Sequence, residues 1–472
     1  MSKRNCVCIP TAGLGTRLGL ITKTINKSLI DINYTPIITH IIKCFPKKTE
    51  FVVPLGYKSE LVKNYLKLAH PDIKFFFVKV KNYAGKGSGL GLSLLSAKKY
   101  LNRPFIFVSC DTLINGKVKF KNKNWVGYSS LKANKNYRKI KINKKNNVEL
   151  FAEKKSNIKN LKNYIGLAEI YDYKQFWKSM KDFKKISIQQ GEFFGLRNLK
   201  TIIKAYKFDW IDVGNLDAYL KIKNNFLKSN KKFNILDKPN EKIWFNDNIV
   251  IKFFKDESIS KKRVLRYKTL KNFIPKLLDY KKNIYSYSKE NGTIFSKISN
   301  KNIFLRLLNH IEKFHKYKKL PKFNKNYVKN KCNNFYKTKT IKRINLFYKR
   351  YKVKDNLLPI NGSKKVKLSL LLNKLNWNFL SEGKFGRYHG DLHFENIIYS
   401  KNKKFIFLDW RHEFDKNVHY GDIYYDLAKL MHGIIVSHDS IIKKKYKINW
   451  NSNKINYEIK NKKIYKYYLK IY

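Results

Sequence analysis

Acidic residues are scarce in this chain. Asp and Glu number 33 against 102 Lys and Arg, so the formal net charge is +69 over 472 residues. A charge of that size is compatible with a basic scaffold that binds nucleic acid. Lysine, however, is spread from Lys3 to Lys470 among abundant Asn, Ile, Tyr and Phe, residues whose codons are all rich in A and T. We therefore attribute the charge to overall composition, as a solvated lysine surface, and expect no specific nucleic-acid partner.

Cysteines and long apolar runs are also few. The five cysteines show neither zinc-ligand spacing nor a CxxC pair, so we expect buried, reduced thiols. The apolar run at 6–9 is too short for a signal peptide. No run approaches the roughly 18 apolar residues that span a bilayer. These absences predict a cytoplasmic protein without a transmembrane segment. They do not distinguish a monomer from a homo-oligomer.

What is present is enough apolar material for more than one folded domain. Hydrophobic residues make up 43% of the chain and aromatic residues 15%, which excludes a disordered basic tail. Up to residue 111, short apolar strands alternate with amphipathic helices. The strands are predicted at 5–10, 51–57, 75–80 and 104–111, and the helices at 36–45, 59–69 and 89–101. This alternation predicts a doubly wound α/β sheet whose ligands bind beyond the carboxyl ends of the strands.

The pattern changes further along the chain. Strand-like pieces follow from about residue 118, and a polar segment at 228–242 carries a proline. We predict a boundary there, with domains at 1–230 and 240–472. The second domain begins with a hairpin at 242–254 and continues as a helix-rich region. Within it, the Lys/Asn-rich stretch 318–345 is interpreted as compositional rather than informative.

The first candidate site is the glycine-containing loop GLGTRLG at 13–19, with Lys27 further along the same connecting segment. Glycine lets a backbone approach phosphates closely, and Arg and Lys supply positive charge to them. The loop is not the dinucleotide fingerprint, because Leu18 stands where the third glycine would fall.

The longer segment GLGTRLGLITKTINKSLIDINYTPII at 13–38 resembles the signature of sugar-phosphate nucleotidyltransferases and their phosphocholine cytidylyltransferase relatives. Five later segments agree with that family in order: LGYKSELVKNYL (55–66), GKGSGLGLSLLSA (85–97), VSCD (108–111), AEKK (152–155) and WIDVGNLDAY (210–219). The resemblance covers about 1–226. It implies an α/β domain with a Rossmann-like, GT-A-type mixed sheet, and CTP as the expected nucleotide.

The resemblance also implies roles for single residues. Those expected at the nucleotide are Gly13, Gly15, Thr16 and Gly87, those expected as catalytic cations are Arg17 and Lys27, and those expected to share Mg²⁺ are Asp111 and Asp212. A phosphate oxygen that attacks the α-phosphorus accumulates negative charge, which a metal and cations offset. The alternative is that these residues are surface cations and turn acids. Asn26 and Lys155 each replace a proline of the family pattern.

A second set of chemistry-bearing residues lies near the end of the chain. Asp391 is followed five residues later by Asn396, and an apolar strand at 405–408 ends in Asp409. This is the kinase arrangement of one catalytic base and two Mg²⁺ ligands. Because glycine follows His389, the segment resembles aminoglycoside phosphotransferases and choline kinases rather than protein kinases.

That resemblance covers about 240–440 and implies an α+β, two-lobed, protein-kinase-like domain that uses ATP. Asp391 would be the base, Asn396 and Asp409 would hold Mg²⁺, and Lys252 would bind phosphate. No glycine-rich loop precedes Lys252, and the helix predicted at 260–273 offers no glutamate to pair with it. We interpret Asp422 and Asp426 as structural caps.

The two resemblances together predict a bifunctional transferase. It would phosphorylate a small alcohol such as choline, ethanolamine, a polyol or a sugar. It would then transfer a nucleotidyl group from CTP, or another NTP, to the phosphorylated headgroup for capsule or lipopolysaccharide biosynthesis. One alternative is a nucleotidyltransferase whose kinase domain is inactive or acts on an unrelated metabolite. The other, from a different class, is the basic nucleic-acid-binding scaffold.

Overall fold

The computed structural model describes residues 5–131, 136–156, 158–229, 238–317, 319–355, 359–363, 367–451 and 454–472. Contacts divide the chain into two compact units, Met1–Lys255 and Asp256–Tyr472. This division falls after the segment at 228–242 where the sequence changes composition, because the hairpin at 241–254 is grouped with the first unit. In the described residues no helix is both long and apolar enough to cross a membrane.

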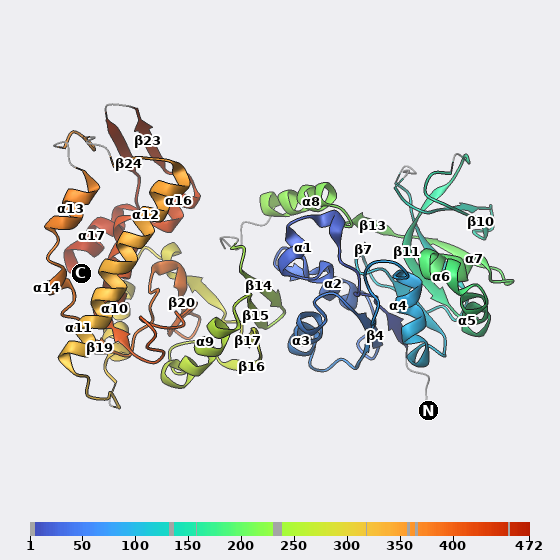
Figure 1. Ribbon diagram of the computed structural model, residues 1–472, viewed down its shortest axis with the longest axis horizontal. Coiled ribbons are helices and arrows are strands. Elements are labelled where there is room, and N and C mark those ends of the chain that lie inside the picture. Colours follow the sequence, from blue (N-terminus) through green and yellow to red (C-terminus); the bar gives the residue numbers. More distant parts are fainter. Residues whose placement is uncertain are drawn as a thin grey trace. The chain divides into compact units, whose positions relative to one another are not determined.

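The first unit is built on a mixed sheet, which confirms the predicted fold class (Figure 1). Its parallel part has the order β6-β1-β4-β5, and β11 continues it antiparallel to β6. The strands are β1 (Cys6–Cys8), β4 (Glu50–Leu55), β5 (Phe75–Lys79), β6 (Phe105–Val108), β8 (Trp125–Ser129), β9 (Lys139–Ile142), β10 (Val148–Ala152), β11 (Lys162–Ile170) and β12 (Lys204–Lys207). Strands β1, β4 and β6 are buried throughout, as expected where helices cover both faces of a parallel sheet.

The described helices of this unit are α1 (Ile21–Thr24), α2 (Ile37–Lys43), α3 (Ser59–Ala69), α4 (Leu90–Ala97), α5 (Tyr173–Asp182), α6 (Lys184–Gln190), α7 (Glu192–Arg197) and α8 (Leu216–Ser229). Helix α3 buries Leu61, Val62, Tyr65 and Leu66, the apolar stripe that its sequence period predicts. Gly91 of α4 lies so close to α6 that an added Cβ would be 1.9 Å from the Ser187 carbonyl oxygen. Glycine is therefore needed there for packing.

The unit is completed by two two-stranded ribbons, β2 (Asp31–Ile32) with β3 (Thr35–Pro36) and β7 (Thr112–Asn115) with β13 (Asp209–Asp212), and by the antiparallel pair of β14 (Glu241–Asn246) with β15 (Ile249–Phe254). The last is the predicted hairpin, with Asp247 at φ +49° in its turn. The ribbon β7–β13 matters most for the site, because it begins directly after β6 and places Asp212 opposite Thr112.

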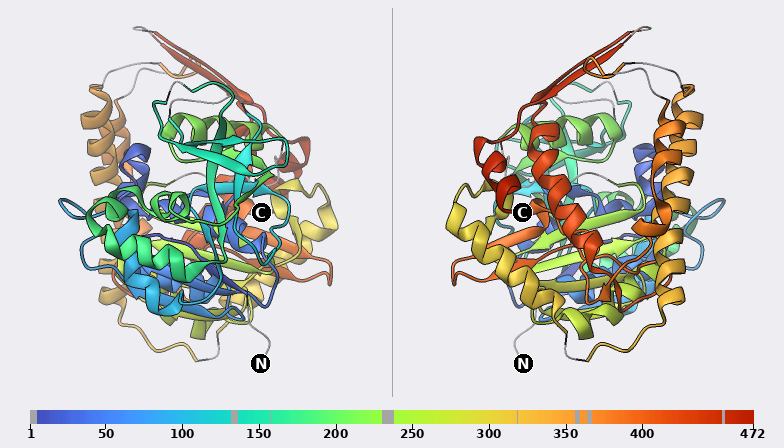
Figure 2. Two further views of the ribbon diagram at one scale, coloured as in Figure 1. Left: turned by 90° about the vertical axis from the view of Figure 1, so that its right-hand side faces the viewer. Right: turned by 90° about the vertical axis from the view of Figure 1, so that its left-hand side faces the viewer.

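The second unit is α+β (Figure 1). Its strands are β16 (Leu277–Lys281), β17 (Ile284–Ser288), β18 (Gly292–Ile294), β19 (Phe385–Gly386), β20 (Ile397–Ser400), β21 (Phe405–Phe407), β22 (Gly421–Asp422), β23 (Tyr446–Trp450) and β24 (Ile455–Ile459). Its described helices are α9 (Glu257–Leu270), α10 (Lys301–His315), α11 (Lys325–Asn333), α12 (Lys339–Tyr351), α13 (Leu368–Lys374), α14 (Trp377–Leu380), α15 (Ile423–Ile435), α16 (His438–Ile442) and α17 (Lys463–Ile471). Figure 2 shows β23 and β24 as a red ribbon projecting from the unit.

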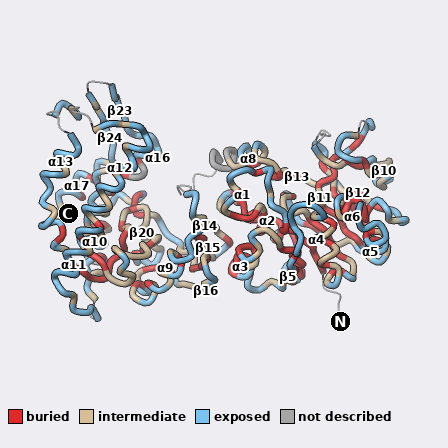
Figure 3. Tube along the Cα trace, in the orientation of Figure 1, coloured by how far each residue is buried: buried red, intermediate tan, exposed pale blue. Residues whose placement is uncertain are grey.

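The Lys/Asn-rich stretch is not merely compositional, and this expectation was wrong. It forms α11 and α12, joined by a π-helical segment, η5 (Asn334–Thr338). Val328, Cys332 and Phe335 recur at helical spacing and are buried, so an apolar stripe lies within the polar sequence. Beyond it, α12 and α13 are largely exposed (Figure 3). Single π segments inside helices often mark functional positions.

Candidate active sites

The glycine loop of the first unit lines a pocket of about 380 Å³. Its wall brings together segments that lie far apart in the sequence: 10–17, 26–27, 83–93, 109–110 and Gly214. Gly13, Gly15, Thr16, Arg17 and Lys27 all line it, and Gly87 directly precedes the lining residue Ser88. The pocket lies beyond the carboxyl ends of β1 and β6, the edge at which open α/β sheets bind ligands.

Two glycines are required by close approaches around this loop. Gly15 has φ +71°, and an added Cβ would lie 3.0 Å from the Lys27 side chain. Gly56 follows β4, and an added Cβ would lie 2.6 Å from the Ala12 carbonyl oxygen. Both positions exclude larger residues, so the loop can lie against its neighbours and leave its outer face open.

Asn26, which departs from the family pattern, anchors the segment that carries Lys27. Its side chain is buried and makes four hydrogen bonds. The amide nitrogen donates to the carbonyl oxygens of Thr11 (2.9 Å) and Tyr57 (2.7 Å), and the amide oxygen accepts from the Ser28 N–H (2.9 Å) and hydroxyl (2.8 Å). Asn26 therefore caps the short helix at 27–29 and ties it to the end of β1.

Lys27 forms an ion pair with Asp111, 84 residues away in the sequence. The Ser109 hydroxyl donates a second hydrogen bond to the same carboxylate, at 2.5 Å. Burial would lower the pKa of Lys27, but the Asp111 carboxylate outweighs burial and raises it. Burial would likewise raise the pKa of Asp111, but Lys27 and Ser109 bring it below its usual range. Both groups are therefore charged at neutral pH.

Asp212 lies beside Asp111 because β13 pairs with β7. An added Cβ on Gly214 would lie 2.9 Å from Asp111 Oδ2 and 3.0 Å from Asp212 Oδ1, so the two carboxylates converge on one glycine. The Gly214 N–H (2.8 Å) and the Asn215 amide (3.1 Å) donate to Asp212. Tyr137 also donates its hydroxyl proton to Asp212. Burial and the Asp212 charge raise the pKa of that phenol, so it stays protonated.

These residues fit the expected Mg²⁺. The described residues contain no cluster of three or more His, Cys, Asp or Glu that could hold a metal alone. Mg²⁺, however, usually takes one or two carboxylates and completes its shell with water and substrate phosphates. Asp111 and Asp212 supply that pair, and the Lys27 ammonium now balances the charge of Asp111.

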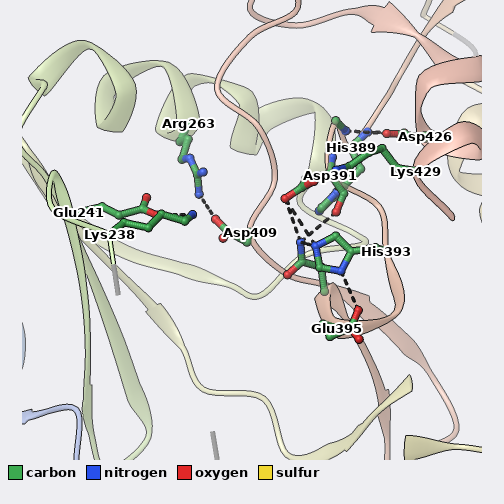
Figure 4. Close-up of polar contacts among 12 residues, drawn as sticks. Lys238, Glu241, Arg263, His389, Asp391, His393, Glu395, Asp409, Asp426 and Lys429 are labelled. Carbon is green, nitrogen blue, oxygen red and sulfur yellow. Dashed lines mark hydrogen bonds and ion pairs between the residues drawn. The ribbon is translucent and has the colours of Figure 1, made fainter. Parts of the chain in front are cut away.

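In the second unit, Asp391 and Asn396 lie in one loop with His393 (Figure 4). The Asn396 amide nitrogen donates to the Asp391 carbonyl oxygen (2.9 Å) and approaches Asp391 Oδ2 (3.4 Å). This orientation leaves the Asn396 amide oxygen as the ligand atom for a cation. His393 lies between Glu395 (3.0 Å) and Asp391 (3.7 Å). Burial would lower the pKa of His393, but the two carboxylates raise it to about 9.

The other Asp391 oxygen, Oδ1, lies 2.8 Å from the Lys429 ammonium on α15. Burial would raise the pKa of Asp391, but His393 and Lys429 bring it far below its usual range. Asp391 is thus an ionised carboxylate held by cations on both sides, as Figure 4 shows. It can accept a hydrogen bond from a substrate hydroxyl and orient it.

Asp409 follows β21 and has φ +58°, an uncommon backbone conformation for a residue other than glycine. Its carboxylate forms an ion pair with Arg263 of α9. Burial would lower the pKa of Arg263, but Asp409 raises it. The sequence predicts a helix at 260–273 without a glutamate, whereas the observed helix begins earlier and has Glu257 in its first turn. The residue that this helix presents to Asp409 is the cation Arg263. An oxygen pair from Asn396 and Asp409 fits Mg²⁺ in the presence of nucleotide phosphates.

Two buried charged residues hold the loop that carries Asp391. Asp426 accepts the backbone N–H groups of His389 (2.5 Å) and Gly390 (2.6 Å). Arg266 donates to the carbonyl oxygens of Tyr388, His389 and Arg411. Asp422 caps α15, as expected, but Asp426 does not, because it lies within α15 and its carboxylate points to the loop.

Residues 341–442 match the model of the Phosphotransferase enzyme family. The N-terminal half is similar to two archaeal proteins named Bifunctional protein GlmU. The relative from Methanocaldococcus jannaschii is 30% identical over 250 residues, which is 51% of this chain and 57% of that protein. The relative from Methanococcus maripaludis is 27% identical over 232 residues, 46% of this chain and 53% of that protein. The chain thus spans about half the length of the curated relatives it matches.

The chain thus joins a domain with the nucleotidyltransferase fold to a domain that matches the Phosphotransferase enzyme family over residues 341–442. Both resemblances inferred from the sequence are thereby confirmed. Solved structures similar to the first domain include UDP-glucose pyrophosphorylase complexed with UDP-glucose, at 17% identity and a TM-score of 0.40 over 48% of this chain and 100% of that one. Another is CTP:phosphocholine cytidylyltransferase from Streptococcus pneumoniae, at 16% identity and a TM-score of 0.39 over 47% of this chain and 99% of that one. Such similarity concerns the fold alone.

The structure brings most of the predicted site residues together in two sets. In the nucleotidyltransferase domain they are Gly13, Gly15, Thr16, Arg17, Lys27, Asp111 and Asp212, and in the phosphotransferase domain they are Asp391, Asn396 and Asp409. Lys252 is buried on β15 and belongs to the first unit, whereas Asp391 belongs to the second. Sequence analysis assigned no role to Tyr137, His393, Arg263 and Lys429. Their partners are distant or their motifs unspecific, so only the folded chain shows them.

Proposed function

We propose that the chain is a bifunctional transferase that makes a nucleotide-activated headgroup in two steps. The phosphotransferase domain phosphorylates the hydroxyl of a small alcohol with ATP. The nucleotidyltransferase domain then transfers a nucleotidyl group, with CTP as the expected donor, onto the new phosphate. The observation that carries this proposal is that one chain holds two sites, Lys27–Asp111–Asp212 and Asp391–Asn396–Asp409. In each of them, cationic side chains form ion pairs with carboxylates of the site. A role in surface-glycan biosynthesis is part of the proposal.

In the first step, the acceptor hydroxyl donates a hydrogen bond to Asp391. Its oxygen forms a bond to the γ-phosphorus of ATP while the bond from that phosphorus to the bridging oxygen breaks, and ADP leaves. The hydroxyl proton passes to Asp391. Mg²⁺, when bound by Asn396 and Asp409, would offset phosphate charge. A weakly basic carboxylate suffices, because phosphoryl transfer has a loose transition state in which positioning dominates.

In the second step, a phosphate oxygen of the phosphorylated alcohol attacks the α-phosphorus of the nucleotide. The bond from that phosphorus to the bridging oxygen of the β-phosphate breaks, and pyrophosphate leaves. The nucleophile is already ionised, so the step needs no general base. Arg17 and Lys27 hold the phosphates as charge develops, and Mg²⁺ held by Asp111 and Asp212 would supply further positive charge.

The test is a mass-spectrometric screen of products from ATP, CTP, Mg²⁺ and mixed alcohols. The mixture contains choline, ethanolamine, glycerol, glycerate and common sugars. Wild type should yield a nucleotide-linked species, Asp111→Asn should stop at the phosphorylated alcohol, and Asp391→Asn should form neither. When the phosphorylated alcohol is supplied, Asp391→Asn should again give the nucleotide-linked product. A wild-type product that survives unchanged in Asp391→Asn without that supply would contradict the two-step order.

A further inference from the structure

Positively charged side chains gather on one side of Asp391. Lys429 contacts Asp391 Oδ1 directly. Arg411 lies against the same loop, since an added Cβ on Gly390 would be 2.5 Å from the Arg411 Cβ and 3.1 Å from its Cδ. Lys339, the first residue of α12, completes the group with Arg343 one helical turn further along. We call Lys339, Arg343, Arg411 and Lys429 the cation cluster.

One aromatic ring joins two members of the cation cluster. The Lys339 ammonium lies 3.9 Å from the centroid of the Phe335 ring, and the Arg411 guanidinium lies 5.0 Å from it. Phe335 belongs to the π-helical segment and is buried against Phe414, with ring centroids 4.1 Å apart. The π segment thus fixes the start of α12 next to the loop of Asp391. A rigid ring holds these cations where flexible surface lysines would separate.

The cation cluster has little compensating charge. In the described part of the chain, no carboxylate lies within ion-pair distance of Lys339, Arg343 or Arg411. Burial and the charges of Arg411, Arg343 and Lys429 lower the pKa of Lys339 to about 7. Like charges held together in a partly buried place are costly, and a bound anion would relieve that cost.

The cluster lies on the acceptor side of Asp391 rather than on the metal side. Asp391 Oδ2 faces Asn396 and His393, next to the residues that fit Mg²⁺ and the nucleotide phosphates. Asp391 Oδ1 faces Lys429. Asp409 has a cation of its own, Arg263 (Figure 4). A hydroxyl that approaches Oδ1 therefore brings the rest of its molecule toward the cation cluster.

We propose that the phosphoryl acceptor is an alcohol that carries its own anionic group, a carboxylate or a phosphate, and that Lys339, Arg411 and Lys429 bind that group. This inference rests on the proposed kinase activity and narrows its substrate class. It excludes choline and ethanolamine, whose positive charge the cluster would repel. During transfer the hydroxyl proton goes to Asp391, and the γ-phosphoryl group of ATP moves to the substrate oxygen while ADP leaves. The second anionic group stays bound and unchanged.

Calorimetric binding to the full-length protein tests this without requiring turnover. Mg²⁺ and the non-hydrolysable analogue AMP-PNP fill the nucleotide site, including the γ-phosphate position, at constant ionic strength. The probes are glycerate, glycerol 3-phosphate, glycerol and choline, so that carboxylate, phosphate, neutral and cationic alcohols are compared. The variants are Lys339→Met and, as a matched control on the same exposed helix, Lys342→Met.

The expected result is binding of glycerate or glycerol 3-phosphate at least tenfold tighter than glycerol and choline. Lys339→Met should weaken that binding about tenfold and leave AMP-PNP binding unchanged, while Lys342→Met should change neither. Lys339→Met should keep or raise the melting temperature, because it removes like-charge repulsion. Preferred binding of choline, no binding of either anion, or an effect of Lys339→Met on AMP-PNP alone would overturn the inference. If anions bind as expected but no alcohol is phosphorylated, the site assignment stands and the kinase proposal fails.

Discussion

The Asn26 amide donates a 2.9 Å hydrogen bond to the Thr11 carbonyl oxygen and so ties the segment of Lys27 to the end of β1. Asn26→Ala would leave buried carbonyl groups unpaired, and we expect a loss of about 2 to 4 kcal/mol in the free energy of unfolding. Because Lys27 then loses its fixed position, nucleotidyl transfer should fall more than tenfold in kcat. Urea unfolding and steady-state kinetics with a supplied phosphorylated alcohol measure the two effects.

Asn124→Ala is the matched control for this prediction. Asn124 is also buried and makes four hydrogen bonds, to the Asp172 carboxylate and Thr201 and from the N–H groups of Tyr171 and Asp172, none of which lines the pocket. It should lower stability by a similar amount without the loss in kcat. Equal kinetic losses in both variants would show that Asn26 acts through stability alone.

The strand and helix pattern of the first domain was predictable, because its buried strands are apolar runs between amphipathic helices. The hairpin at 241–254 was predictable from its turn residues. The expectation for 318–345 was wrong because three apolar residues at helical spacing are hidden among Lys and Asn. A window average of composition does not detect so sparse a stripe, although its period does.

Local motifs predicted the site residues expected to approach phosphates, because those residues lie within the motifs themselves. Residues whose role depends on a partner far away in the sequence could not be predicted. Tyr137 meets Asp212 across 75 positions, and Arg263 meets Asp409 across 146. Such pairs depend on how helices and ribbons pack, and a single sequence holds no local signal for them.

Lys27→Met tests the charge balance at Asp111. Without the ammonium, the developing charge on the transferring phosphate loses a cation, and mutations of this kind typically cost about 10²- to 10³-fold in kcat. Phosphorylation of the alcohol should keep its rate, because that reaction uses Asp391. Lys23→Met, which changes an exposed lysine of the same connecting segment, should leave both rates unchanged. A nucleotidyl transfer rate that survives Lys27→Met would remove Lys27 from the proposed machinery.

Asp426→Asn tests how the loop of Asp391 is held. The amide offers one acceptor where the carboxylate accepts two backbone N–H groups, so we expect the loop to shift and stability to fall by about 3 kcal/mol. The kcat of phosphoryl transfer should fall more than tenfold. Asp422→Asn is the control, because Asp422 accepts the N–H groups of Lys384 and Tyr424 outside that loop. For Asp422→Asn we expect a loss of stability comparable to that of Asp426→Asn but a much smaller effect on kcat. The same loss of kcat in both variants would count against a positioning role for Asp426.

Glu192 makes the stability of the first domain depend on pH. Burial raises its pKa from 4.5 to about 7, with Arg138 offsetting burial only in part, and one carboxylate oxygen has no hydrogen-bond partner among the described residues. Between pH 4.5 and 7 the folded state keeps a proton that the unfolded state releases, so stability falls as pH rises through this window, by about 3 kcal/mol. Urea unfolding of Glu192→Gln should lack this loss, whereas Glu149→Gln, which changes an exposed residue of β10, should retain the wild-type slope. A difference between wild type and Glu192→Gln that does not vary from pH 4.5 to 7 would show that Glu192 is ionised throughout.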